Sequence, residues 1–275
     1  MSEGTDSALL ERFEQEVWSK VPHLEEGSET KIVNVTPLVD MTVDFKECAK
    51  NVFKLDLDNA DLKVFGKMDS TLLTGSIKVR PAANIIHDAI VTGKIRSGQT
   101  VIEATSGNFG IALGLLSKLG LNVIALVSRK LQEGVFEELR NGNIRTMDLD
   151  MDICPAPGME GKQNLMVAKA TAANVRSQLS NLGFDTDIFD KEISEIESLL
   201  AKQDIINLAK FLAEKYGFFC PAQYDNQLNV EAHRTITAAE IDQQLHEIGD
   251  SLENFNVFCT SVSYTHLTLP TILLV

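Results

Sequence analysis

The part of the sequence between residues 64 and 149 alternates short apolar runs with longer stretches in which apolar residues recur at helical spacing. Each short run has the length of one strand, and each longer stretch has the length of one helix. Strands and helices that alternate along a chain form right-handed βαβ units around a parallel sheet. The expected strands are residues 64–69, 100–104, 121–127 and 144–149, and the expected helices are residues 81–92, 111–119 and 131–140.

A glycine-punctuated turn, Thr105-Ser106-Gly107-Asn108-Phe109-Gly110, joins the expected strand 100–104 to the next helix. Such a turn exposes several backbone N–H groups at a helix N-terminus, which is a ready site for an anion. Ligands of parallel sheets bind at the carboxyl ends of the strands, where this turn falls. A simpler reading is that Ser106 or Asn108 only caps the helix.

A lysine lies at the start of an earlier helix, in Gly75-Ser76-Ile77-Lys78-Val79-Arg80-Pro81. Pro81 suits the first helical turn, which places Lys78 at the helix N-terminus. The positive end of the helix dipole opposes a second positive charge there. A lysine that is also desolvated loses basicity and can attack a carbonyl as a neutral amine. The alternative is that Lys78 is an ordinary solvated lysine. Lys78 and the Thr105–Gly110 turn together indicate a ligand that carries both an aldehyde and an anionic group.

A third polar segment, Gln223-Tyr224-Asp225-Asn226-Gln227-Leu228-Asn229, follows a short apolar run at 218–220, with His233 just beyond. Taken alone, it is typical of a surface turn. Lys78, the Thr105–Gly110 turn and this segment, in this order, resemble the pyridoxal-phosphate (PLP) enzymes of fold type II, the cysteine synthase and cystathionine β-synthase family. That fold also includes tryptophan synthase β chains. Thr36-Pro37-Leu38-Val39 is similar to a segment near the start of this family.

The resemblance runs from about Thr36 to about Val262 and implies two open parallel-sheet α/β domains with PLP in the cleft between them. Lys78 would hold PLP as a Schiff base and shuttle the α-proton. Asn108 would hydrogen-bond the phenolic oxygen of PLP, and Gln223 would face the substrate. The substrate α-carboxylate would bind the loop lined by Thr105, Ser106, Gly107 and Phe109.

The implied reaction is β-replacement on an activated L-serine, O-acetylserine or O-phosphoserine, through an aminoacrylate, with PLP as the electron sink. Sulfide as nucleophile would make the chain similar to cysteine synthase. Arg80-Pro81-Ala82 and the Gln223–Asn229 segment also resemble siderophore-pathway synthases that add glutamate to O-phosphoserine, N-(2-amino-2-carboxyethyl)-L-glutamate synthases on the route to 2,3-diaminopropionate. Dehydratases of this fold usually carry histidine where Phe109 stands, which disfavours deamination.

The sequence departs from the family pattern at three places. Val79 replaces the usual aspartate, Leu72-Leu73 replaces the usual Asn-Pro, and residues 175–205 look like a helical insertion. These differences bear on the substrate more than on the cofactor.

The end of the sequence lacks the glycine-rich loop that holds the PLP phosphate in the family. No glycine follows Gly249 and no Asp, Glu, Lys or Arg follows Glu253, although the loop is expected soon after a strand at 255–260. Residues 263–271 resemble a translated sequencing adapter, so we expect the native sequence to stop near Val262, with the second domain truncated. The alternatives are a true C-terminal strand at 267–275 and an inactive, non-catalytic relative that binds partners.

The expected domain organisation follows from these patterns and from a break at residues 155–158. Residues 1–62 would form an N-terminal helix, at 7–20, and a segment that packs on the second domain. Residues 63–153 would be the smaller α/β domain with the carboxylate loop. Residues 154–262 would be the partial second domain, and residues 263–275 a non-native tail.

The composition narrows the possible partners and compartments. The 275 residues are 44% hydrophobic and 23% charged, as in a globular protein, and the net charge of −14 argues against nucleic acid and anionic membranes. The four cysteines and five histidines show no metal-ligand spacing, which favours reduced thiols and no metal. An acidic start without a signal peptide favours the cytoplasm. We expect a small amino-acid substrate and, from the resemblance, a homodimer.

Overall fold

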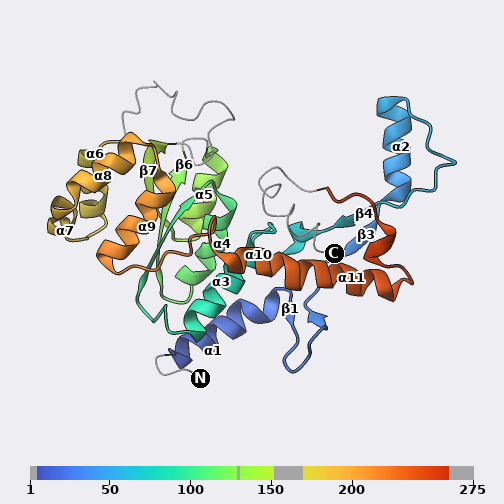
Figure 1. Ribbon diagram of the computed structural model, residues 1–275, viewed down its shortest axis with the longest axis horizontal. Helices are drawn as coiled ribbons and strands as arrows, with labels where there is room; N and C mark the ends of the chain where they lie inside the picture. The colour runs from blue at the N-terminus through green and yellow to red at the C-terminus, as the bar shows by residue number, and fades with distance from the viewer. Residues whose placement is uncertain (1–4, 129–130, 152–169, 260–275) are drawn as a thin grey trace. The chain divides into compact units, whose positions relative to one another are not determined.

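The computed structural model describes residues 5–128, 131–151 and 170–259 (Figure 1). The chain divides into two compact units. Unit 1 comprises residues 1–18 and 78–229, and unit 2 comprises residues 19–77 and 230–275. Every candidate site residue named above, from Lys78 to Gln223, belongs to unit 1.

Unit 1 is built on a parallel sheet in the order β5-β6-β7, formed by β5 (Thr100–Thr105), β6 (Asn122–Ser128) and β7 (Arg145–Met151). Phe219 extends the sheet on the free side of β5 through a parallel bridge to Val101. Its N–H donates to the carbonyl of Thr100, and its carbonyl accepts from Ile102, both at 2.9 Å. The three strands expected between residues 100 and 149 are therefore confirmed.

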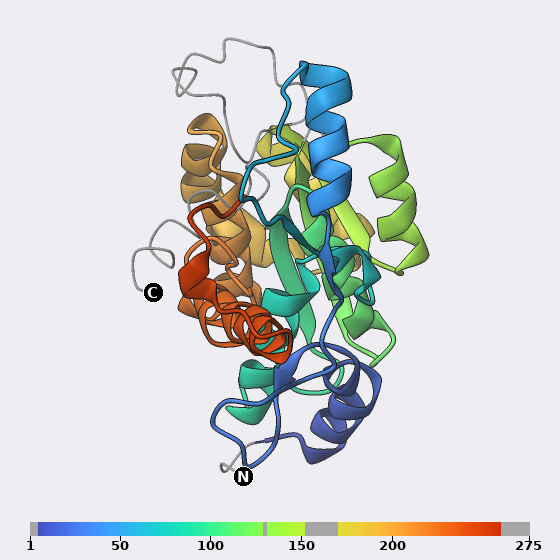
Figure 2. The same ribbon diagram turned by 90° about the vertical axis from the view of Figure 1, so that its right-hand side faces the viewer.

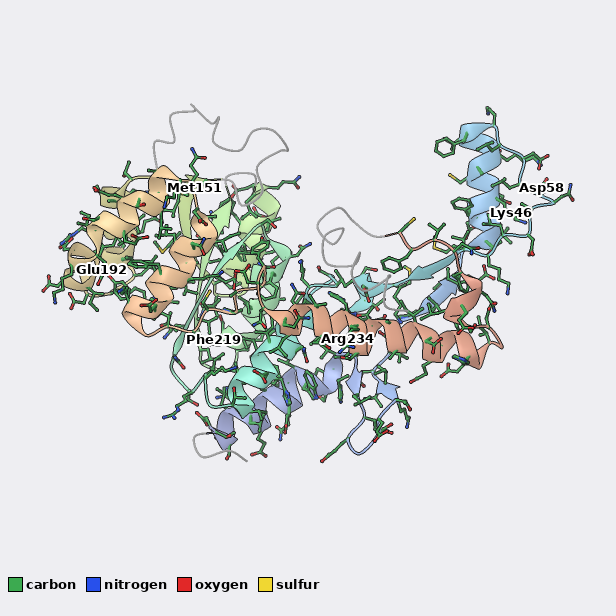
Figure 3. The ribbon with its side chains drawn as sticks, viewed as in Figure 1. Lys46, Asp58, Met151, Glu192, Phe219 and Arg234 are labelled. Atoms are coloured by element: carbon green, nitrogen blue, oxygen red, sulfur yellow. The ribbon has the colours of Figure 1, made fainter. Side chains whose placement is uncertain are left out.

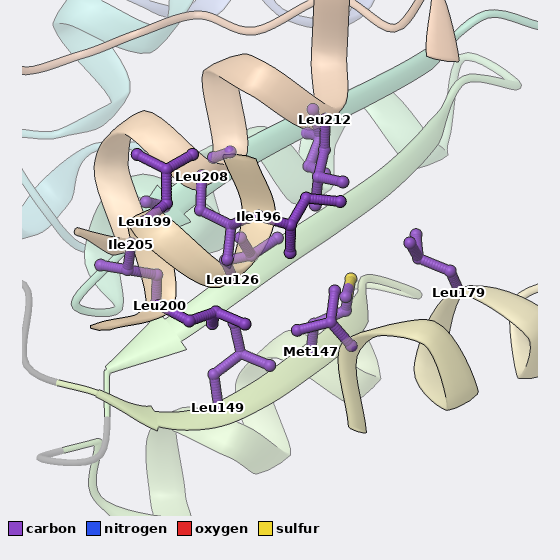
Figure 4. Close-up of a cluster of buried hydrophobic side chains, with 14 of the residues drawn as sticks. Leu126, Met147, Leu149, Leu179, Ile196, Leu199, Leu200, Ile205, Leu208 and Leu212 are labelled. Atoms are coloured by element: carbon purple, nitrogen blue, oxygen red, sulfur yellow. The ribbon is translucent and has the colours of Figure 1, made fainter. Parts of the chain in front are cut away.

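Helices cover both faces of this sheet (Figure 1 and Figure 2). One layer contains α1 (Ser7–Glu16), α3 (Val79–Val91), α4 (Asn108–Ser117) and α5 (Glu133–Asn141), with α3 packed against α1 and α4. The other contains α6 (Ala172–Asn181), α8 (Ile193–Ala201) and α9 (Ile205–Tyr216), whose apolar faces meet alternate residues of the strands. Figure 4 shows this core, with Leu126, Met147 and Leu149 facing Leu179, Ile196 and Leu208.

The polar segment 183–190 contains the short helix α7 (Thr186–Lys191). The side chain of Asp185 caps the helix by accepting from the N–H of Asp187 at 2.9 Å. Phe189 is buried in the core of unit 1. The helix is short and its exposed side is polar, so its composition resembles that of a loop.

Unit 2 contains two antiparallel strand pairs. β1 (His23–Leu24) pairs with β2 (Ile32–Val33), and β3 (Leu38–Asp40) pairs with β4 (Phe65–Lys67). β4 confirms a strand within the expected range 64–69, but its partner makes it antiparallel and separate from the sheet of unit 1. Lys46 on α2 (Thr42–Phe53) ties the following loop to the helix by donating to the carbonyl of Ala60 at 2.8 Å (Figure 3).

A helical run of three parts follows the polar segment after Phe219. It consists of α10 (Gln227–Glu231), a π-helical stretch (Ala232–Thr237) and α11 (Ala238–Glu247), with a short 3₁₀ turn at Leu252–Asn254 beyond it. The expected strand at 255–260 is wrong for residues 255–259, because no neighbouring strand in the described chain pairs with them. Residue 260 lies outside the described residues.

The division into units differs from the domain boundaries expected from the sequence. Residues 170–229 belong with the sheet of unit 1, because α6, α8 and α9 cover one face of β5–β7. The N-terminal helix α1 also packs in unit 1, against α3. The break at 155–158 and the tail at 263–275 lie outside the described residues.

The described chain contains neither a candidate membrane span nor a candidate metal cluster. No helix there is long and apolar enough to cross a membrane. No group of three or more histidine, cysteine, aspartate or glutamate side chains within those same residues is placed to hold a metal ion.

Candidate functional site

The turn after β5 is held from inside by the hydroxyl of Thr105. Its Oγ1 accepts hydrogen bonds from the N–H groups of Gly107 and Gly110, both at 3.1 Å. Gly107 has φ +136°, a conformation that side-chain-bearing residues rarely adopt, and a Cβ there would lie 2.9 Å from a methyl of Val135. A Cβ at Gly110 would lie 2.7 Å from Cγ2 of Thr105. Both glycines are thus required by the tight path of the turn.

The same turn opens α4 with amides that can receive an anion. In the described chain, the N–H groups of Asn108 and Phe109 have no hydrogen-bond acceptor, and they lie at the positive end of the helix dipole. The side chains of Ser106 and Asn108 are exposed, whereas that of Phe109 is only 1% exposed. Phe109 can therefore face a ligand only through its backbone.

The simpler reading, in which Ser106 or Asn108 caps the helix, is wrong. The N-cap position of α4 is Gly107, and no side chain makes the capping hydrogen bond. The hydroxyl and amide side chains of Ser106 and Asn108 are consequently left to face solvent or a ligand.

Lys78 occupies the N-cap position of α3, as the sequence predicts. Its backbone is already in the α region, its carbonyl accepts from the N–H of Ala82 at 3.2 Å, and its side chain is partly buried. Val79, which departs from the family pattern, is fully buried and lines the α1–α3–α4 interface. A carboxylate at that position would be desolvated in an apolar interface, which accounts for the valine.

Gln223 is brought to the carboxyl end of β5, next to the Thr105–Gly110 turn. Its side-chain Nε2 donates to the carbonyl of Ala104 at 3.1 Å, and its own carbonyl accepts from Nδ2 of Asn229 at 2.7 Å. The structure therefore places Gln223 beside the turn, although more than a hundred residues separate them. Lys78 begins α3, which packs against α4.

Sequence patterns missed Glu103 and gave no role to Asn229, and both are buried polar residues close to Gln223. Glu103 lies in β5 and is 1% exposed, and the thiol of Cys220 lies 3.9 Å from its Oε2. Burial raises the pKa of Glu103 to about 8, against the opposing effect of the nearby backbone amides of Gln223 and Ala222. Burial and the neighbouring Glu103 also raise the pKa of Cys220. The available signal was a glutamate inside an otherwise apolar strand.

A cavity of about 310 Å³ lies elsewhere in unit 1. It is bounded by the second half of α3 and by residues 219–228, including Asp88, Lys94 and Cys220. None of the candidate site residues lines it, so the candidate site rests on the turn, the helix termini and Gln223.

The chain is similar to known proteins over much of its length. Residues 51–267 match the family described as "Pyridoxal-phosphate dependent enzyme". The chain is 39% identical over 94 residues to a cysteine synthase of Aquifex aeolicus, covering 34% of this chain and 26% of that protein. It is 26% identical over 226 residues to a cysteine synthase of Staphylococcus aureus, covering 82% and 54%.

A third relative is the O-ureido-L-serine synthase of Streptomyces lavendulae, 27% identical over 179 residues, with 65% of this chain and 41% of that protein covered. A crystal structure of O-ureido-L-serine synthase matches with 24% identity and a TM-score of 0.47, covering 79% of this chain and 49% of that chain. The chain thus spans about half the length of these relatives, or less. Because the family match covers well over half of the chain, the protein belongs to the pyridoxal-phosphate dependent enzymes, α/β proteins of fold type II whose cofactor is PLP.

Proposed function

We propose that the chain is part of an enzyme that replaces the β-substituent of an activated L-serine, with sulfide as the incoming nucleophile and cysteine as the product. The chain supplies the lysine that binds the cofactor and the turn that binds the substrate carboxylate. The observation that carries this proposal is the meeting of Gln223 with the Thr105–Gly110 turn at the carboxyl end of β5. The names of the relatives, cysteine synthase and O-ureido-L-serine synthase, support chemistry on a serine-derived substrate.

The residues present fit PLP at two of its ends. Lys78 would bind the aldehyde carbon and would move the α-proton of the substrate, and the exposed carboxamide of Asn108 would donate to the phenolic oxygen. When bound, PLP supplies an electron sink for the carbanion formed at the α-carbon. The glycine-rich phosphate loop that the resemblance implies would follow residue 260, outside the described residues, and the sequence there contains no glycine.

The substrate carboxylate would bind the open N-terminus of α4. The N–H groups of Asn108 and Phe109 and the hydroxyl of Ser106 supply the donors, while Thr105 and Gly107 hold the turn in shape. Fixed donors of this kind need no reorganisation during the reaction, which is how a protein stabilises charge. Gln223 would contact the substrate from the side of β5.

The function is tested by β-replacement assays with O-acetyl-L-serine and O-phospho-L-serine as donors and sulfide as the acceptor. We expect cysteine to form and Lys78→Ala to abolish it. Lys94→Ala is the matched control, since Lys94 follows the other end of α3 and pairs with Asp88 at 3.2 Å. Activity that survives Lys78→Ala would contradict the assignment, and no product from either donor would favour the non-catalytic alternative.

Glutamate is a second candidate for the acceptor. The Arg80-Pro81-Ala82 run and the Gln223–Asn229 segment favour it, because both resemble the siderophore-pathway synthases. The same assay with equal concentrations of sulfide and glutamate separates the two. A product containing glutamate, formed from O-phospho-L-serine in preference to cysteine, would replace the sulfide proposal with this one.

A further inference from the structure

Gln223 begins a loop whose two ends are joined by a buried hydrogen bond. The loop runs from Gln223 to Asn229, and Nδ2 of Asn229 donates to the carbonyl of Gln223 at 2.7 Å. Both residues are buried. Breaking such a bond would leave the carbonyl unpaired away from water, which is costly. The backbone of Gln223 is therefore held in place by the side chain of Asn229.

Asn226 supports the inside of the same loop. Its Nδ2 donates to the carbonyl of Pro221 at 2.9 Å, and its Oδ1 accepts from the N–H of Leu228 at 3.0 Å. An asparagine that bonds the backbone two residues further on builds a local turn. The carbonyl of Asn226 also accepts from the N–H of Asn229 at 3.0 Å. The turn at Asn226 thus directs Asn229 back towards the start of the loop.

The loop is tied to two elements of the candidate site. At its start, Nε2 of Gln223 donates to the carbonyl of Ala104, near the end of β5, at 3.1 Å. Near its end, Nδ2 of Asn84 on α3 donates to the carbonyl of Leu228 at 2.9 Å. Because α3 begins next to the proposed cofactor lysine, the loop connects the helix of that lysine to the strand that leads into the substrate-carboxylate turn.

We infer that Asn229 is a positioning residue, which fixes Gln223 between β5 and α3 through its hydrogen bond to the carbonyl of Gln223. The role rests on the proposed function for the identity of the substrate, whereas the hydrogen bonds depend only on contacts within unit 1. Asn229 is 1% exposed, so it acts through Gln223 and does not touch the substrate.

The positioning is tested first without cofactor or substrate, by NMR measurement of hydrogen exchange at the side-chain carboxamide of Gln223. Asn229→Leu removes Nδ2 and puts an apolar group in its place. Within the described chain Oδ1 of Asn229 has no hydrogen-bond donor, so the bond to Gln223 is the side-chain hydrogen bond that this variant removes. We expect exchange of the Gln223 carboxamide to rise about tenfold, because a released backbone loosens the bond from Nε2 to Ala104.

Gln178→Leu is the matched control for this experiment. Nε2 of Gln178 on α6 donates to the carbonyl of Asp148 on β7 at 3.0 Å, which is the same kind of bond on another strand of the sheet. The control should leave exchange at the Gln223 carboxamide unchanged. An equal rise in Gln178→Leu, or a rise spread evenly over unit 1, would overturn the inference because it would mean general destabilisation.

Unchanged exchange at Gln223 in Asn229→Leu would also overturn the inference. Should this variant fail to fold, Asn84→Leu decides the matter, since it cuts the tie between the loop and α3 at a half-buried position. It should raise the same exchange by a smaller factor, and no rise would overturn the inference. None of these outcomes needs enzymatic activity, so a failure of the proposed function is distinguishable from a failure of the positioning.

The consequence for the reaction is tested by a double-mutant cycle on β-replacement with O-acetyl-L-serine. If Asn229 acts through Gln223, the double variant Asn229→Leu, Gln223→Ala should have the same kcat/KM as Gln223→Ala alone. We expect Asn229→Leu alone to raise KM more than it lowers kcat, as a loss of substrate positioning should, and Gln178→Leu to change neither. Losses that multiply in the double variant would show that Asn229 does not act through Gln223.

Discussion

The two compact units bury their apolar side chains to very different extents. Unit 1 closes a core between its sheet and two layers of helices, and of its described large hydrophobic residues only Ile193, at 39%, is exposed. Unit 2 leaves many exposed, among them Val43, Val52 and Phe53 on α2 and Val257 near the end of the described chain. All candidate site residues lie in unit 1, so the site is carried by the unit whose core is complete in itself.

Unit 2 relies instead on a buried polar network. Lys67 on β4 donates to Oε1 of Glu240 on α11 at 2.8 Å and to the carbonyl of Thr36 at 2.7 Å. The same glutamate oxygen accepts from the N–H of Thr36 at 2.6 Å. A strand, a loop and a helix thus meet at one carboxylate. Packing therefore dominates in unit 1, while buried polar contacts around Glu240 join a strand, a loop and a helix of unit 2.

The largest expected effect comes from opening the core of unit 1. Leu208→Ala should lower the free energy of unfolding by about 2–5 kcal/mol, because it removes a fully buried side chain and leaves a cavity. Val52→Ala on the exposed side of α2 is the control and should change it by less than about 0.5 kcal/mol. Urea unfolding measures the change in free energy of unfolding for both variants. Equal changes would contradict the difference in packing between the two units.

The next effect tests the polar network of unit 2. Glu240→Ala should lower the free energy of unfolding by about 3 kcal/mol, because it leaves the largely buried ammonium of Lys67 without its carboxylate partner. Lys67→Met combined with Glu240→Leu should recover part of that loss, since it removes both charges. Unfolding followed by a probe in unit 2 measures this, and a double variant worse than Glu240→Ala would argue against the pair as the connecting group.

A pH dependence of stability between about pH 4.5 and 8 should come from Glu103 in unit 1. The pKa of Glu103 is raised from 4.5 to about 8, so between these values the folded state keeps a proton that the unfolded state has lost. The free energy of unfolding should therefore fall as pH rises through this window, by about 1.4 kcal/mol per unit, and level off above it. Glu103→Gln should remove this slope. A slope that persists in the variant would assign it to another group.

The smallest effect on stability concerns α2. Val43→Ser with Phe53→Ser replaces two side chains that are 71% and 69% exposed, so the free energy of unfolding should change by less than about 0.5 kcal/mol. Self-association should nevertheless decrease, because exposed apolar surface favours it. Sedimentation at several concentrations measures this. A large loss of stability would mean that these side chains pack against something within the chain.

Local patterns predicted the parts of the fold that depend on local sequence. The strands and helices from β5 to β7 follow apolar periodicity, and Lys78 at a helix start follows from Pro81. The Thr105–Gly110 turn could be recognised because its glycines are needed for close approach and a positive φ. These features can be read from a few neighbouring residues.

The features that escaped prediction depend on distant contacts. The hydrogen bond from Nε2 of Gln223 to the carbonyl of Ala104 exists only because Phe219 joins the sheet beside β5. The helix α7 packs on the core through Phe189, a contact that local sequence does not reveal. Residues 255–259 form no strand because a strand needs a partner that local sequence does not supply. The boundaries of the units likewise follow from which helices cover the sheet.

The central claim is that unit 1 holds the cofactor through Lys78. The protein should be incubated with PLP, reduced with borohydride, digested, and mapped by mass spectrometry. We expect a single pyridoxyl-modified peptide that contains Lys78, retained in Lys94→Ala and lost in Lys78→Ala. A modification that is spread over surface lysines, or that persists at full yield in Lys78→Ala, would contradict the account.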